Sequence, residues 1–119
     1  HLRRVPAVVR FVSYEPALGP LILQRAPAEQ LNLGGIDWVL VGGESGPGYR
    51  PLDLQWGRDV RDACDRAGVA FFWKQSAAWR TEMGITLDGE TRRAWPTPRG
   101  VAPVLRLPLF AEQSPAHRA

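Results

Sequence analysis

The stretch IDWVLVGGESGPGYR, residues 36–50, is an apolar run that ends in two glycines, a glutamate and a glycine-rich loop. A short run rich in β-branched and aromatic residues predicts a buried strand. The charged Glu44 would then lie just beyond the end of that strand. In α/β proteins the functional side chains collect at this end of the strands.

The residues that follow predict a helix and a second strand. Asp53 is suited to cap a helix, apolar side chains then recur at helical spacing, and Gly68 supplies a stop. The apolar positions of this helix are Trp56, Val60, Ala63, Cys64 and Ala67. Residues 69–73 (VAFFW) are apolar again, so residues 36–73 predict a βαβ unit with parallel strands.

An earlier strand is predicted at residues 8–14 (VVRFVSY), and a short helix is expected at residues 28–33. All three predicted strands are apolar nearly throughout, which favours parallel strands covered on both faces. One long helix does not cover two faces, so we expect further strands and helices before His1. The chain is therefore expected to be the C-terminal part of a longer α/β protein.

The pattern changes after Gln75. Asp88 and Gly89 favour the positive φ angles of a tight turn, so residues 85–95 predict a small hairpin. Repeated prolines and small polar residues then predict an irregular tail. The expected division is residues 1–80 for the strands, residues 81–96 for the hairpin and residues 97–119 for the tail.

Composition narrows the class of protein. The chain has 119 residues, of which 45% are hydrophobic and 23% are charged, as expected for one globular domain or a piece of a larger one. It contains neither an apolar run of about 18 residues nor a signal peptide, so a cytoplasmic location is expected. The net charge of +3 comes from 15 basic and 12 acidic residues, a weak bias that favours a solvated surface over a nucleic-acid patch.

Each predicted strand ends in polar side chains. Glu15 follows the first strand, Glu44 follows the second, and Lys74 and Gln75 end the third. The carboxyl ends of parallel strands share one edge, so these groups could converge on a zwitterionic ligand or transfer protons. The alternative interpretation is that each charge only marks where its strand emerges into water.

The glycine loop allows two interpretations. Gly42, Gly43, Gly46 and Gly48 would permit close backbone approach to a ligand, and Arg50 could contact an anion. The order of glycines differs from GxGxxG, and no Gly-Lys-Ser/Thr follows, so neither a dinucleotide fingerprint nor a P-loop is present. A turn-forming loop beside a ligand is favoured over a phosphate cradle.

The single cysteine, Cys64, lies on the apolar side of the predicted helix and is expected to be a core residue. One thiol forms neither a disulfide framework nor a cysteine metal site within the chain, and no metal ligands are predicted. The two histidines, His1 and His117, lie at opposite ends of the chain, which gives a histidine-based triad little support.

Five segments together resemble the phage-type gene-product thirty-seven/sixty-eight family, whose members are related to radical S-adenosylmethionine enzymes. These segments are RFVSYEPALGPL, IDWVLVGGESGPGYRPLD, CDRAGVAFFWKQ, LDGE and AWP, in that order. The resemblance implies that the three strands are the last three of a partial, TIM-like parallel β/α barrel. An N-terminal cysteine motif outside this chain would hold a [4Fe-4S] cluster, and the missing N-terminal half of the barrel would be the partner.

The resemblance also implies roles for the strand ends. Residues Gly42, Gly43, Glu44 and Ser45 become candidates to bind S-adenosylmethionine. Glu15, Lys74, Gln75 and Arg50 become candidates to bind a substrate of unknown identity. Because Cys64 alone does not hold an iron–sulfur cluster, this chain by itself is expected to be inactive.

Two function classes therefore remain open. The first is the C-terminal portion of a radical S-adenosylmethionine-like phage or prophage protein that contributes to a cofactor and substrate pocket. The second is a non-catalytic phage-type protein that binds nucleic acid or a protein, based on Trp79, Trp95 and the arginines of residues 91–99. A degenerate remnant that does not fold is a third interpretation.

Overall fold

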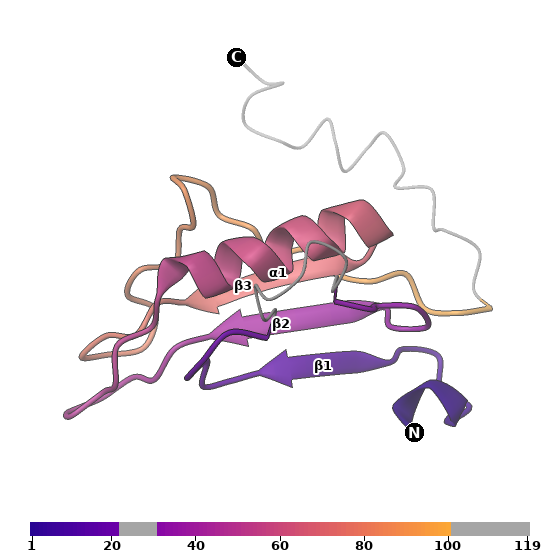
Figure 1. Cartoon of the computed structure of the whole chain (residues 1–119), viewed down its shortest axis with the longest axis horizontal. Coiled ribbons are helices and arrows are strands. Elements are labelled where there is room, and N and C mark those ends of the chain that lie inside the picture. Colours follow the sequence, from indigo (N-terminus) through magenta and orange to yellow (C-terminus); the bar gives the residue numbers. More distant parts are fainter. Residues whose placement is uncertain (22–30, 101–119) are drawn as a thin grey trace, which may run out of the picture.

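The computed structural model describes residues 1–21 and 31–100. Its elements are a 3-10 helix η1 (Leu2–Arg4), strands β1 (Phe11–Tyr14), β2 (Trp38–Gly42) and β3 (Ala70–Gln75), and helix α1 (Leu54–Ala67). The strands form one parallel sheet in the order β1-β2-β3, and α1 lies along one side of it (Figure 1). The parallel strands and the βαβ unit predicted from the sequence are confirmed.

The core lies between the sheet and α1. Alternate residues of two strands, Val39 and Val41 of β2 and Phe71 and Trp73 of β3, are fully buried. From the helix, Val60, Ala63 and Cys64 complete this layer, and Leu87 joins it from a later turn. Large apolar side chains on one face of the sheet thus hold α1 in place.

Helix α1 begins and ends where its sequence predicts. The Asp53 side chain accepts a hydrogen bond of 2.8 Å from the backbone N–H of Gln55, and Gly68 ends the helix in the left-handed conformation. The helix approaches the sheet closely at Gly57, where an added Cβ would lie 2.5 Å from the Trp73 ring. A glycine inside the helix therefore makes room for the largest core side chain.

The expected partial β/α barrel is wrong. The three strands form an open sheet, and the described residues contain one α-helix instead of a repeating series of strand and helix. The helix expected at residues 28–33 is absent at residues 31–33, and its remaining residues lie outside the described part. Barrel closure depends on strand tilt and stagger across many strands, so apolar strands in parallel order do not by themselves specify it.

In the described residues a helix covers one face of the sheet, and the other face has none. On the face opposite α1, Trp38, Leu40 and Phe72 are only half-buried and Phe11 is exposed. We call this the helix-free face. Within residues 1–21 and 31–100 no second α-helix packs there, because α1 is the one α-helix of this part of the chain and it lies on the other face.

A later segment of the chain covers the β3 edge of the sheet. The chain returns alongside β3, where Trp73 donates a 2.7 Å hydrogen bond to the carbonyl of Arg92 and Ala94 donates one of 3.1 Å to the carbonyl of Phe71. A two-residue turn at Asp88 and Gly89, both with positive φ, precedes this segment. Its flanks form isolated bridges instead of the two strands of the expected hairpin.

The structure describes only the beginning of the predicted tail. Residues 97–100 have no helix or strand, and residues 101–119 lie outside the described part. Among the described residues, no helix combines the length and the apolar character that a membrane crossing requires.

Candidate functional site

Glu15 and Lys74 meet at the carboxyl edge of the sheet. Strand β2 separates β1 from β3, yet the Lys74 Nζ lies 3.3 Å from the Glu15 Oε1. Between them is Gly42, where an added Cβ would lie 2.7 Å from the Glu15 Oε1 and 3.4 Å from the Lys74 Cβ. The missing side chain at position 42 therefore allows the two charges to meet across the central strand.

The Glu15–Lys74 pair is held on one side and open on the other. The Ser13 hydroxyl donates a 2.8 Å hydrogen bond to the second carboxylate oxygen of Glu15. The Lys74 side chain is 47% exposed and that of Glu15 is 26% exposed. An ion pair that is partly in water contributes about 0–1 kcal/mol, so a ligand with both charges can replace it at small cost.

Glu44 makes a separate pair with Arg50. Its carboxylate accepts the Arg50 backbone N–H at 2.7 Å and Nε at 2.9 Å, and it also pairs with Nη2. These bonds lower the pKa of Glu44 and raise the pKa of Arg50. Glu44 is therefore kept ionised and ties together the two ends of the glycine loop, which suits it poorly for proton transfer near neutral pH.

Gly43 and Gln75 form a third, internal group. An added Cβ at Gly43 would collide with the backbone of Ala77, whose Cα would be 2.7 Å away. The buried Gln75 side chain donates a 3.4 Å hydrogen bond to the Gly43 carbonyl and accepts one of 2.9 Å from the Glu82 N–H. Close backbone approach at Gly43 is thus used by the protein itself.

The structure therefore divides the predicted site residues. It brings Glu15 and Lys74 together over Gly42, and it places Glu44 with Arg50 and Gln75 with Gly43 in separate contacts. Ser45 is exposed and continues the strand pairing through a parallel bridge to Ala78. The pair over Gly42 joins charges from the ends of β1 and β3 and leaves both partly exposed, whereas Glu44 and Arg50 pair within one loop.

An aromatic cluster on the helix-free face was missed from the sequence. It consists of Phe11, Trp38, Phe72 and Trp95. The Trp38 ring centroid lies 6.0 Å from Phe11, 5.9 Å from Phe72 and 4.7 Å from Trp95. The apolar run that contains Trp38 predicts a buried strand, whereas the alternation of Phe11, Ser13 and Glu15 in and just after β1 is a signal that one face is partly polar.

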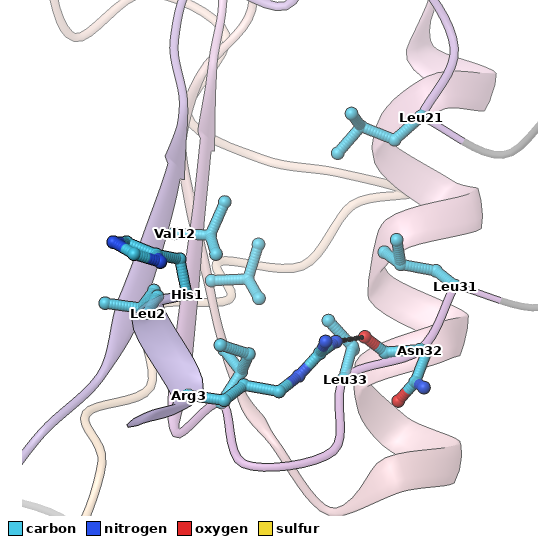
Figure 2. A pocket seen from close by; sticks show the side chains of 10 residues that line it. His1, Leu2, Arg3, Val12, Leu21, Leu31, Asn32 and Leu33 are labelled. Carbon is cyan, nitrogen blue, oxygen red and sulfur yellow. Dashed lines mark hydrogen bonds between the residues drawn. The ribbon is translucent and has the colours of Figure 1, made fainter. Parts of the chain in front are cut away.

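A cavity of about 290 Å³ lies on the other side of the sheet, near η1 (Figure 2). Val12, Leu31, Leu33, Ile36 and Val39 give it an apolar lining. Arg3 also lines the cavity, and its guanidinium group donates hydrogen bonds of 2.7 Å to the carbonyl of Asn32 and 2.6 Å to that of Gly34. The cavity therefore offers apolar surface with its main charge already engaged.

Cys64 does not fit the role of a cluster ligand. It is fully buried on the side of α1 that faces the sheet, and burial raises the pKa of its thiol to about 12. A cysteine binds a metal as its thiolate, and this buried environment disfavours the thiolate. Nor does the described part of the chain group three histidine, cysteine, aspartate or glutamate side chains that could hold a metal ion.

Comparison with known proteins gives one match. The model of a family described as "Protein of unknown function (DUF5131)" matches residues 1–103. No curated protein and no solved structure matches the chain. The family match covers 103 of the 119 residues.

Proposed function

The chain belongs to the DUF5131 family, and we propose that the carboxyl edge of its sheet binds the amino-acid moiety of S-adenosylmethionine. The Glu15 carboxylate would accept the ligand's ammonium group, and the Lys74 ammonium would bind its carboxylate. Each protein charge would then exchange its present partner for one on the ligand.

The observation that carries this proposal is the position of the ion pair over Gly42. The two charges lie 3.3 Å apart, are partly exposed, and stand above a residue without a side chain. An α-amino acid carries its own two charges on neighbouring groups, so one such ligand can satisfy both residues. Ser13 supports the geometry because its hydroxyl already orients the Glu15 carboxylate.

The resemblance to proteins related to radical S-adenosylmethionine enzymes supports the choice of ligand. Under this proposal, Gly42 makes space for the amino-acid moiety. Glu44 and Arg50 act indirectly by holding the loop that begins at Ser45. Gln75 fixes the backbone beneath the site through Gly43 and does not touch the ligand.

The [4Fe-4S] cluster implied by the same resemblance does not fit the residues of this chain. Its one cysteine is buried in the core with a pKa of about 12, whereas cluster ligands are thiolates. The proposal is therefore one of ligand binding, and no reaction is assigned to the chain.

Isothermal titration calorimetry with S-adenosylmethionine tests the proposal. We expect Glu15→Gln and Lys74→Met each to weaken binding by at least about tenfold, because each removes a charged hydrogen bond. Asp65→Asn is the matched control, since it removes another exposed ion pair, with Arg92, from the helix side of the sheet. Its affinity should equal that of the unmodified chain.

Competing ligands define the moiety that is bound. Methionine and S-adenosylhomocysteine should both compete with S-adenosylmethionine, whereas adenosine, which lacks the two charges, should compete poorly. Equal affinities for the unmodified, Glu15→Gln and Lys74→Met chains would refute the assignment of these residues.

A further inference from the structure

The geometry points to a second binding surface. We infer that the helix-free face binds single-stranded nucleic acid by stacking bases on the aromatic cluster. This inference is independent of the proposed function, because the cluster does not include Glu15 or Lys74.

Two members of the aromatic cluster are exposed far more than folding requires. Trp95 is 72% exposed and Phe11 is 52% exposed, on either side of the half-buried Trp38. Trp38 itself is fixed, because its indole N–H donates a 2.9 Å hydrogen bond to the carbonyl of Ala94. The face therefore presents rings on a rigid base, which limits the entropy lost when a ligand stacks on them.

Trp95 is positioned by its neighbours and not by burial. Its ring stacks at a 36° tilt on Trp38 and meets Phe72 edge-on, with centroids 5.9 Å apart. These contacts orient the indole while leaving most of its surface in water. An oriented, accessible indole is suited to stacking against a nucleobase, since every base has a π face.

The charges beside the cluster suit a polyanion. The Arg93 guanidinium lies 5.3 Å above the centre of the Phe72 ring, and Arg10 directly precedes Phe11. Arg93 also pairs with Glu82, and Asp37, which precedes Trp38, pairs with Arg99. Among the described residues Arg10 has no carboxylate within ion-pair distance, so the charges beside the cluster leave a positive excess.

This combination favours nucleic acid over a protein partner. The cores of protein interfaces are depleted in charged residues, whereas single-strand binding surfaces combine cations with stacking aromatics. The positive balance beside the cluster agrees in sign with the net charge of +3 for the whole chain. The phosphate backbone would follow the cations while bases stack on Phe11 and Trp95.

Fluorescence anisotropy with labelled oligonucleotides of about 12 nucleotides tests the inference. Thymidine and uridine oligomers report on single-stranded DNA and RNA, and a duplex of equal length reports on shape. We expect single strands to bind more tightly than the duplex, with an affinity that falls as salt rises. Trp95→Ala and Phe11→Ala should each weaken single-strand binding by at least about fivefold.

Trp79→Ala is the matched control. Trp79 is 58% exposed, makes no ring contact with the aromatic cluster, and its replacement leaves the charge unchanged. Its affinity should stay within about twofold of the unmodified chain, below the effect of one lost stack. Circular dichroism should show the same helix and strand content for all the variants.

Three outcomes would overturn the inference. Equal losses in all three variants would mean that no particular ring is used. Equal binding of duplex and single strands would indicate attraction to charge alone. Absence of binding, together with self-association that Trp95→Ala abolishes, would identify the face as a protein interface instead. S-adenosylmethionine affinity should be unchanged in Trp95→Ala, so the two proposals fail separately.

Discussion

The two faces of the sheet use the same strands in different ways. On the helix side, Phe71 and Trp73 are fully buried against α1. On the helix-free face, Phe72 is half-buried, Lys74 is exposed and Phe11 stands largely in water. Neighbouring residues along one strand therefore serve stability on one side and remain accessible to ligands on the other.

This difference separates folding from binding. The core includes Val39, Val41, Val60, Phe71 and Trp73. Their side chains lie between the sheet and α1, on the opposite side of the sheet from the Glu15–Lys74 pair and the aromatic cluster. Substitutions on the helix-free face should therefore change binding with little effect on stability. Substitutions on the helix side should do the reverse.

The largest expected effect is that of Trp73→Ala. Removing this buried ring leaves a cavity under Gly57, so the free energy of unfolding should fall by about 3–5 kcal/mol. Urea denaturation followed by circular dichroism measures it. Trp95→Ala removes the same atoms from the other face and should cost less than about 1.5 kcal/mol, the contribution of its aromatic contacts. Similar losses for both would contradict the division between the faces.

The pH dependence of Cys64 provides the next test. Burial raises the pKa of its thiol from 9.0 to about 12 in the folded chain. Above pH 9 the thiol ionises in the unfolded chain but stays protonated in the folded chain. Rising pH therefore stabilises the unfolded state relative to the folded state. Relative to Cys64→Ala, the unfolding free energy should be constant below pH 9 and fall by about 1.4 kcal/mol per pH unit above it.

The same thiol should resist modification in the folded chain. A thiol reagent at pH 8 should react only after urea unfolds the protein, because thiolate is the reactive form. Rapid reaction without urea would show that Cys64 is not packed beneath α1.

A smaller effect distinguishes the two adjacent glycines. Gly43→Ala forces a Cβ against the rigid backbone of Ala77 and should destabilise the chain by about 1–3 kcal/mol. Gly42→Ala meets side chains instead, most closely the flexible end of Glu15, and should cost less than about 1 kcal/mol. Its effect should appear in S-adenosylmethionine affinity instead, as calorimetry and urea denaturation of both variants can establish.

The smallest effect concerns Asp37, which directly precedes β2. Its carboxylate accepts 2.9 Å and 2.7 Å hydrogen bonds from the Arg99 side chain and the Arg10 backbone, which lower its pKa. The stabilisation is present above the usual value of 3.8 and is lost as the pH falls through the lowered pKa. Asp37→Asn should cost about 1 kcal/mol at pH 7. In urea denaturation the difference between the two chains should shrink as the pH falls below 3.8.

Local signals explain what the sequence could predict. Asp53 and Gly68 mark the helix ends because capping depends on residues that are adjacent in the chain. Runs of β-branched and aromatic residues mark the strands for a similar reason. The observed strand ends differ from the predicted ends by up to three residues. Strand β1, for example, begins at Phe11 instead of residue 8.

Contacts between distant residues explain what the sequence could not predict. Whether a sheet closes into a barrel depends on strand stagger and on elements that no short motif encodes. That Glu15 meets Lys74 and not Glu44 depends on strand order and on Gly42 between them. The role of Gly57 likewise depends on the Trp73 ring of β3. Helix propensity alone only indicates that glycine is unfavourable at this position.

The central claim is that the amino-acid moiety of S-adenosylmethionine binds over Gly42. A nuclear magnetic resonance titration of the isotopically labelled chain tests it most directly. The largest amide shifts should occur at Glu15, Gly42 and Lys74, with little change at Val60 in the core. Shifts confined to the residues around Arg3 and Leu31, which line the apolar cavity of Figure 2, would contradict the claim. So would the absence of any shift at saturating ligand.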